Sequence, residues 1–397
     1  MEKVINVFSE IGKLKSVLVH KPGREVENLT PDTLERLLFD DIPHLEVAIK
    51  EHDYFCQIMK DNGVEVLYVE ELAAQTLDVV SDDVKNDFIN IFITEAKVKD
   101  DVKEILFDYL NKLNNKAMID AMIAGISKRE LNYKDDDEYP FICDPLPNVL
   151  FQRDPFASIG NGVSLNKMWS ITRNRETIFP NLIFKHHPRF KDKVNLFYDR
   201  NYDQPIEGGD ILVLNDQTLI IGATQRTTLE AIEKISSNLF EKNSKYKKVI
   251  ALDVPKSRAF MHLDTVFTNV DYDKFLVHPL IFSQMDLFKI YEITPEHGKR
   301  LINLNLKDYL SQVINKEAIL IPCGGDDPVV SGREQWNDGT NVLTIRPGVV
   351  IAYNRNYVTN QLLRDHGVTV YETLSSELSR GRGGPRCMTM PIFREEI

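Results

Sequence analysis

The chain has 397 residues, of which 43% are hydrophobic and 27% charged, and this composition is typical of a globular protein with two or three domains. Its formal net charge of −12 argues against a nucleic-acid-binding protein, because such proteins use clustered lysines and arginines to neutralise phosphates. The same negative charge mildly favours a cationic small molecule as the binding partner.

The first part of the chain, residues 1–72, predicts two strands with a helical stretch between them. The strands are expected at residues 15–23, which end in a Pro-Gly turn, and at residues 64–70. Between them, residues 32–63 carry apolar side chains at helical spacing and stop at an Asn-Gly pair. This region is expected to belong to the main domain.

Residues 73–144 predict a small all-helical domain inserted into the main one. Its first proline comes near its end, and its only glycine is Gly125. Segments such as residues 100–115 and 116–127 repeat apolar residues at helical intervals. The acidic residues 134–140 then lead out of the insert as a solvated linker.

The third region, from residue 145 onward, repeats a pattern of strand, turn, strand, helix and strand. Repeated units of this kind bury their faces against one another and place equivalent strand ends near a common axis. Polar residues that are distant in the sequence can therefore meet in one site. Copies of the pattern, each with an arginine after its second strand, are residues 208–235 (Arg226), 339–373 (Arg355) and, more loosely, 153–184 (Arg173).

Neither the cysteines nor the hydropathy of the chain indicates a secreted or membrane protein. The four cysteines are far apart and form no CxxC pair, which argues against a zinc ribbon and against a disulfide framework. No stretch approaches the roughly 20 apolar residues of a membrane span. The N-terminal residues 1–16 lack the apolar core of a signal peptide. We therefore expect a cytoplasmic protein without a membrane partner.

Four polar clusters lie at the edges of predicted strands or in a glycine-rich loop: PLPNVLFQRDPF, QPIEGGDILVL, FMHLDTVF and GRGGPRCM. In FMHLDTVF the histidine and the aspartate alternate on one predicted strand and so share a face. The glycines of GRGGPRCM predict a loop, and its arginines favour the thiolate form of the cysteine. The candidate residues in these clusters are Asn148, Asp154, Glu207, Asp210, His262, Asp264 and Cys387.

Each cluster also has a purely structural interpretation. Asp154 could pair with Arg153 in a local turn, and EGGD could be no more than a tight turn. His262 and Asp264 could form an exposed surface pair, and the cysteine could be incidental. A metal site is the least favoured interpretation, because the nine histidines are scattered and the one adjacent pair, His186-His187, lies in a basic loop.

Taken together, a thiol, an imidazole and several carboxylates suit attack on a planar cationic group. A guanidinium has five N–H donors in a fixed fork, and carboxylates accept from it in pairs. Carboxylates alone would raise the pKa of a neighbouring thiol, which argues against a cysteine protease. A bound guanidinium reverses that objection, since its positive charge offsets the carboxylates and stabilises the thiolate.

Five motifs, PLPNVLFQRDP, IEGGD, MHLDTVF, REQWNDGTNVL and GRGGPRCMTMP, occur together and in this order. With the N-terminal KSVLVHKPG and the helical insert, they resemble the bacterial arginine deiminases of the guanidine-modifying superfamily, particularly those of mollicutes. The resemblance covers essentially the whole chain. It implies an α/β fold in which five pseudo-repeated ββαβ units, from residues 1–72 and 145–397, form a propeller, with residues 73–144 as the inserted all-helical domain.

For function, the resemblance implies hydrolysis of L-arginine to L-citrulline and ammonia through a covalent S-amidino-cysteine intermediate, without metal or organic cofactor. Cys387 matches the nucleophile, and His262 matches the general acid and base. Asp154 and Asp264 match the carboxylates that hold the guanidinium. Glu207 matches the carboxylate that orients the histidine.

The amino-acid end of the substrate needs partners of its own. Nearby arginines leave alternatives open there: Arg175 could replace Arg173, and Arg380 or Arg386 could replace Arg382. The resemblance also makes a symmetric homo-oligomer the expected assembly. The residues that match the family's contacts to this end of the substrate are Asn148, Arg173, Arg226 and Arg382.

Two rival functions remain open at the level of sequence. Agmatine deiminases, dimethylarginine hydrolases and amidinotransferases would use the same cysteine, histidine and carboxylates. The available arginines favour free arginine over agmatine, because agmatine has no carboxylate to bind. The second rival is a non-catalytic binding protein on the same fold, and the complete set of five catalytic positions argues against it.

Overall fold

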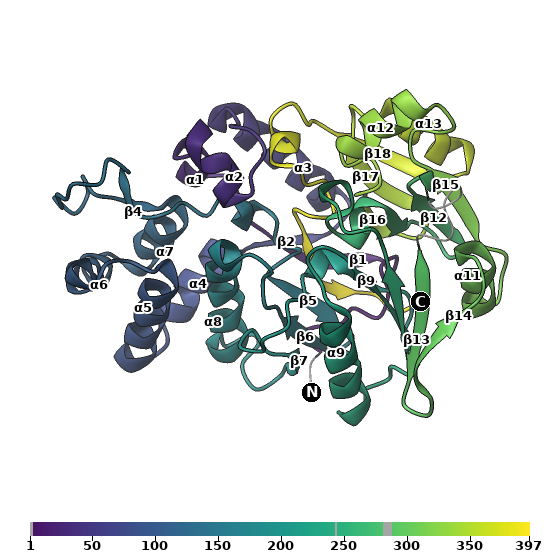
Figure 1. The fold of residues 1–397 in the computed structure, drawn as a ribbon, viewed down its shortest axis with the longest axis horizontal. Helices are drawn as coiled ribbons and strands as arrows, with labels where there is room; N and C mark the ends of the chain where they lie inside the picture. The colour runs from purple at the N-terminus through teal and green to yellow at the C-terminus, as the bar shows by residue number, and fades with distance from the viewer. Residues whose placement is uncertain (1–2, 243, 281–287) are drawn as a thin grey trace.

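The computed structural model describes residues 3–242, 244–280 and 288–397, and its strands form several small sheets (Figure 1). Within these ranges, five groups of three strands share one pattern, in which the first two strands are antiparallel and the third runs parallel to the second. The groups are β5 (Phe156–Ile159), β6 (Gly162–Leu165) and β7 (Asn195–Tyr198); β8 (Ile211–Val213), β9 (Thr218–Ala223) and β10 (Lys248–Asp253); β11 (Phe267–Asn269), β12 (Lys274–Val277) and β15 (Ile319–Pro322); β16 (Leu343–Arg346), β17 (Val349–Tyr353) and β18 (Thr369–Thr373); and β19 (Met390–Arg394), β1 (Leu14–Val19) and β2 (Glu65–Tyr68).

In each group a helix separates the second strand from the third along the chain. Helix α9 illustrates why these segments fold: the Thr228 side chain accepts a hydrogen bond from the first turn, and Ile232, Ile235 and Leu239 bury one face. The predicted α/β class is therefore confirmed. The five helices are α8 (Ile178–His186), α9 (Leu229–Glu241), α11 (Leu306–Ile314), α13 (Tyr357–Asp365) and α3 (Leu45–Asp61).

Two features of the sheets are absent from the predicted repeat. Strands β13 (Lys289–Thr294) and β14 (Gly298–Ile302) extend the second group into a five-stranded sheet with the order β14-β13-β10-β9-β8. Strand β19, at the far end of the chain, pairs antiparallel with β1. Because of this pairing, the segment that carries Cys387 is fixed against the first residues of the chain.

The predicted helical insert is mostly helical, and Figure 1 shows these helices to one side of the sheets. The prediction of an all-helical segment is wrong in one respect, since β3 (Ile126–Ser127) and β4 (Phe141–Cys143) form a two-stranded sheet. Strands this short carry too little periodicity to be recognised from sequence. The helices are α4 (Val69–Leu77), α5 (Asp82–Ala96), α6 (Lys103–Lys112) and α7 (Asn115–Ala124).

The helical stretch predicted over residues 32–63 is broken in two. Its first part ends at Leu38, which adopts a left-handed conformation, and α3 begins only after Pro43. Among the described residues, no helix combines the length and apolar character needed to cross a bilayer. Shorter helices are α1 (Arg24–Glu27), α2 (Leu34–Leu37) and α12 (Pro328–Trp336), with 3₁₀ helices η1 (Pro31–Thr33), η2 (Asp100–Val102), η3 (Pro147–Leu150), η4 (Ile171–Thr177), η5 (Gly208–Asp210), η6 (Arg258–Phe260), η7 (Leu263–Thr265) and η9 (Leu378–Gly381).

The glycines of the C-terminal motif are required by close packing. A Cβ added at Gly383 would overlap the Phe151 ring, which is buried and stacks on Phe39. A Cβ at Gly332, inside α12, would meet no described atom within 4 Å.

We predict that Gly383→Ala lowers the free energy of unfolding by about 1–3 kcal/mol, the usual cost of overpacking a core. Gly332→Ala should raise it by about 0.5–1 kcal/mol, because alanine loses less backbone entropy in a helix. Urea denaturation of both variants measures the two effects. Equal effects from the two substitutions would contradict the close packing at Gly383.

Candidate active site

One cavity brings together most of the residues that the sequence singles out. It has an empty volume of about 430 Å³. Glu207 and Asp264 lie behind its wall, in contact with His262 and Cys387 respectively. The predicted site residues that line the cavity are Asn148, Asp154, Arg173, Arg226, His262, Arg382 and Cys387.

His262 lies between two carboxylates. Its Nε2 is 2.7 Å from Oε2 of Glu207, and its Nδ1 is 3.8 Å from Oδ1 of Asp154. Burial alone would lower the pKa of His262, but Asp154 and the Glu207 hydrogen bond outweigh it and raise the pKa to about 9. The resting site therefore holds an imidazolium at neutral pH.

The imidazole packs closely on the Gly-Gly turn of the EGGD motif. A Cβ at Gly209 would come within 2.8 Å of the His262 ring, so only glycine leaves room for it. The prediction that His262 and Asp264 alternate on a strand is wrong. His262 is the N-cap of η7, and the Leu263 N–H bonds to Asp210 rather than to a neighbouring strand. The 3₁₀ turn nevertheless places His262 in the cavity wall and Asp264 behind it, in contact with Cys387.

Glu207 is fully buried and carries its charge there. Its carboxylate accepts hydrogen bonds from His262 and from the backbone N–H of Trp169. Burial would raise the pKa of Glu207, but the His262 hydrogen bond and the charges of Arg226 and Arg173 lower it to about 2. Glu207 is thus a permanent anion that holds the imidazolium.

Cys387 lies in residues 382–389, which join η9 to β19 without helix or strand, as the glycines predict. Its backbone N–H donates to Oδ1 of Asn341 at 2.9 Å, and its Sγ is 3.7 Å from Oδ2 of Asp264. Burial raises the pKa of the Cys387 thiol well above its usual value, and the charges of Asp264 and Asp154 add to this effect. Cys387 is therefore a thiol, not a thiolate, in this environment.

Asp264 is supported from below by Arg386, whose role the sequence does not reveal. Arg386 Nη1 donates to Oδ2 of Asp264 at 2.7 Å, and its Nε and Nη2 donate to Glu10. Arg386 was an alternative to Arg382 for contact with substrate, but its guanidinium is buried in this ion-pair network and does not line the cavity. Glu10 is 376 positions away in the sequence, so no local pattern indicates the pairing.

The three predicted substrate arginines differ in how their donors are used. Arg173 is already paired: its Nη1 is 3.1 Å from Oδ2 of Asp154, and its Nε and Nη2 donate to Glu176. Arg226 and Arg382 are buried, and the described residues offer no hydrogen-bond partner to Nε and Nη1 of Arg226 or to Nε, Nη1 and Nη2 of Arg382. Their carboxylate neighbours are more distant: Glu207 is 4.0 Å from Nη1 of Arg226, and Asp40 is 3.7 Å from Nε of Arg382.

Those two arginines instead lie over the chain's two tryptophans. The guanidinium carbon of Arg226 is 4.8 Å from the centre of the Trp169 ring, and that of Arg382 is 3.6 Å from the centre of the Trp336 ring. Stacking of this kind holds a cation in place while leaving its in-plane N–H groups available. Asn148 is held differently, by a 2.6 Å hydrogen bond to the Leu37 carbonyl.

A metal ion is disfavoured by the charges of the site. Ligand atoms of Asp154, Glu207 and His262 lie within 4.8 Å of one another, a spacing at which a cation could be held. Arg173 already neutralises Asp154, and the pKa of His262 is about 9, whereas metal binding requires a neutral imidazole. The cluster is thus better suited to a guanidinium than to a metal.

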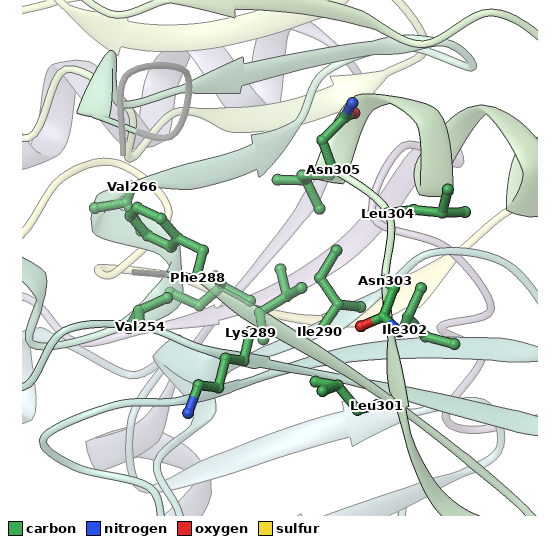
Figure 2. A pocket seen from close by; sticks show the side chains of 13 residues that line it. Val254, Val266, Phe288, Lys289, Ile290, Leu301, Ile302, Asn303, Leu304 and Asn305 are labelled. Atoms are coloured by element: carbon green, nitrogen blue, oxygen red, sulfur yellow. The ribbon is translucent and has the colours of Figure 1, made fainter. Parts of the chain in front are cut away.

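A second pocket, shown in Figure 2, differs in chemistry. It has an empty volume of about 1110 Å³ and lies between the β13–β14 hairpin and the start of α11. Its walls are largely apolar, with Val254, Val266, Phe288, Ile290 and Leu301 among the labelled side chains. Such walls offer a guanidinium few acceptors, so the first cavity remains the candidate site.

Comparison with known proteins identifies close relatives. A family model described as arginine deiminase matches residues 35–394. The arginine deiminase of Mycoplasma capricolum is 62% identical over 100% of this chain and 99% of its own length, and that of Clostridium perfringens is 50% identical over 100% and 99%.

Similar solved structures extend the comparison of folds. SxtG, an amidinotransferase from Microseira wollei in the saxitoxin biosynthetic pathway, has a TM-score of 0.58 at 16% identity and covers 99% of this chain and 98% of that one. The N-terminal domain of ArgZ, bound covalently to a reaction intermediate, has a TM-score of 0.54 at 15% identity, covering 96% and 98%. At these identities the likeness concerns the fold alone.

We predict that His262 of the free protein stays protonated up to about pH 9. Glu207→Gln keeps the shape of the partner but removes its charge, so the pKa of His262 should fall toward the ordinary value of about 6.5. Titration of the histidine ring signals by NMR measures this, with His262 assigned by the signal lost in His262→Asn. Glu241→Gln, an exposed glutamate, is the control. An unchanged His262 titration in Glu207→Gln would contradict the electrostatic role of Glu207.

Proposed function

The chain belongs to the arginine deiminase family, and from this membership and the charge pattern of the cavity we propose that it hydrolyses L-arginine to L-citrulline and ammonia, with Cys387 as the nucleophile. The observation that carries the proposal is the convergence of Cys387, His262 and Asp154 on one cavity with free carboxylate oxygens. A planar cation is the ligand that such a cavity lacks.

The guanidinium of arginine binds between Asp154 and Asp264. Oδ1 of each aspartate is buried and has no hydrogen-bond partner among the described residues. A buried carboxylate oxygen without a donor is costly, so these two atoms favour a ligand rich in N–H groups. The guanidinium carbon is then held close to Sγ of Cys387, which is already 3.7 Å from Asp264.

Binding of the cation activates the thiol. Its positive charge offsets the two aspartates, so the pKa of Cys387 falls and the proton leaves toward Asp264. The thiolate attacks the guanidinium carbon, and a C–S bond forms. The C–N bond to one terminal nitrogen then breaks, with His262 donating the proton that lets this nitrogen leave as ammonia.

The second half of the reaction reverses the role of the histidine. His262, now neutral, takes a proton from water, and the resulting hydroxide attacks the amidino carbon. The C–S bond breaks with its electron pair on sulfur, and the proton held by Asp264 returns to Cys387. The proton of the added hydroxyl leaves to solvent, where ammonia takes it up, and the ureido group of citrulline forms. Glu207 stabilises the imidazolium at the start and end of this cycle, since its 2.7 Å hydrogen bond favours the charged ring.

We infer that the α-carboxylate of the substrate binds Arg226 and Arg382, because the free donors of both line the cavity. Asn148 adds a polar contact at this end. Arg173 has most of its donors occupied by Asp154 and Glu176, so its proposed contribution is to hold Asp154 and to supply positive charge.

The finer points of the architecture are also proposals. The five groups with identical strand pairing support a five-bladed α/β propeller, in which residues 1–72 and 145–397 form the catalytic domain and residues 73–144 an inserted domain. Four free, buried cysteines support a cytoplasmic location, where thiols remain reduced. A symmetric homo-oligomer is proposed from the general prevalence of such assemblies, and its test is the mass of the protein in solution.

We predict that purified protein produces citrulline from L-arginine without added metal, and that Cys387→Ala lowers the rate by more than about 10⁴-fold. A colorimetric citrulline assay measures both. Cys56→Ala, which removes another buried thiol, should keep the wild-type rate per folded molecule. Equal product from wild type and Cys387→Ala would refute the nucleophile, and no product from wild type would refute the proposed reaction.

We predict that Arg226→Ala lowers kcat/KM for L-arginine by roughly 10- to 100-fold, the loss of a charged hydrogen bond to the α-carboxylate. Agmatine, which has no carboxylate, should bind wild type and variant equally when tested as substrate and as inhibitor. Arg189→Ala, which removes a half-buried arginine that is paired with Glu65 outside the cavity, is the control. A similar loss for both ligands would place Arg226 outside the carboxylate subsite, and agmatine turnover above that of arginine would favour the rival function.

A further inference from the structure

Asp210 is a buried carboxylate that the reaction does not use directly. It is 0% exposed and is not among the described residues that line the cavity. Its Oδ1 accepts the backbone N–H of Leu263 at 2.8 Å. Its Oδ2 accepts the hydroxyls of Thr224 and Thr227 at 2.8 and 2.5 Å. One side chain thus collects three donors from two separate segments.

The two threonines also accept hydrogen bonds from the backbone of two site residues. The Thr227 hydroxyl oxygen accepts the backbone N–H of Glu207 at 3.1 Å. The Thr224 hydroxyl oxygen accepts the backbone N–H of Arg226 at 3.0 Å. Each threonine therefore donates to Asp210 and accepts from the backbone of a residue whose side chain acts on the cavity.

The third donor completes the arrangement. Leu263 directly follows His262, so the bond from its N–H to Asp210 fixes the start of η7 and with it the imidazole. Asp210 itself ends η5, the turn that begins after Glu207. Three backbone segments, carrying Glu207, Arg226 and His262, are consequently tied to one carboxylate.

We propose that Asp210 is a positioning residue: it fixes the position of the carboxylate-binding Arg226 relative to the Glu207–His262 pair. The proposal rests on the proposed function, because it assigns Arg226 to binding and Glu207 and His262 to proton transfer. Among the residues that the structure describes, the Thr224 hydroxyl accepts from Arg226 and the Thr227 hydroxyl accepts from Glu207. Removal of one hydroxyl therefore tests one arm, although a backbone hydrogen bond also joins the two threonines.

The three donors around Asp210 favour its ionised form. Burial raises the pKa of Asp210 to about 7, although the neighbouring His262 and the hydrogen bonds from Thr227, Leu263 and Thr224 lower it. Three donors need three acceptor lone pairs, which the ionised carboxylate supplies. Replacement by asparagine keeps an acceptor for Leu263 but substitutes an N–H₂ group for the oxygen that both hydroxyls share.

The test compares Thr224→Val, Thr227→Val and Asp210→Asn. Valine keeps the shape of threonine and removes the hydroxyl. Thr224→Val should raise KM for L-arginine by roughly 10-fold with kcat little changed, and Thr227→Val should lower kcat by roughly 10-fold with KM little changed. Thr227→Val should also shift the NMR titration of His262 to lower pH, and Asp210→Asn should produce both sets of effects.

Asp216→Asn, at the exposed end of the β8–β9 hairpin, is the matched control and should behave as wild type. Melting temperatures of all variants show how much of any loss is unfolding. The proposal is overturned if the two threonine variants change kcat and KM in the same way, or if activity falls only in proportion to the folded fraction. If wild type makes no citrulline, the proposed function fails, and the His262 titration in Thr227→Val still tests the positioning role.

Discussion

The site depends on an incomplete balance of charge around a buried sulfur. Asp154 lines the cavity and Asp264 lies behind its wall, and one oxygen of each has no hydrogen-bond partner among the described residues. Burial and the charges of the two aspartates together hold Cys387 in its neutral form. In the proposed mechanism, the reactive form of the thiol therefore appears only when a cation enters. This arrangement couples recognition to activation, since the same positive charge that satisfies the aspartates stabilises the thiolate. A neutral ligand of equal size would bind less well and would leave the thiol inert.

The buried negative charge beside Cys387 is stabilised by residues that are distant in the sequence. Asp264 would be unstable as an isolated buried anion, and Arg386 compensates it from below, held in turn by Glu10. Glu10 precedes β1 and Arg386 precedes β19, and these two strands pair with each other. The pairing of the first and last strands therefore also brings together the charges that support Asp264. On the other side of the cavity, Glu207 and Asp210 anchor the imidazole. Buried ion pairs and hydrogen bonds thus hold the reacting groups in place, including Cys387 in its loop.

Sequence patterns predict some of this well and some of it not at all. The hairpins predicted to turn at Asn161-Gly162 and at Asn215-Asp216, and the helices that follow them, are local features with clear periodicity and turn residues. The structure has both hairpins, and residues 160–161 and 214–217 connect their strands. The convergence of Cys387 with His262 also follows from motifs that a family shares. The pairing of Arg173 with Glu176 is also local, at i,i+3 spacing, and the sequence-based prediction does not use that spacing. What no local pattern encodes is the pairing of Arg386 with Glu10, because these residues are 376 positions apart and meet only in three dimensions. The 3₁₀ turn at His262 is missed for a related reason: a side chain, Asp210, accepts the backbone bond that a strand would have made.

The positions of the two tryptophans make their fluorescence informative about the site. Each indole is stacked against one of the two arginines whose N–H groups are free, Trp169 against Arg226 and Trp336 against Arg382. Any movement of those guanidinium groups changes the surroundings of the ring beneath, and with it the colour and intensity of the light that the ring emits. Because the chain has no other tryptophan, the intrinsic fluorescence of these two rings reports ligand binding at the two arginines. Replacing either tryptophan by phenylalanine leaves the fluorescence of the other tryptophan to be measured by itself.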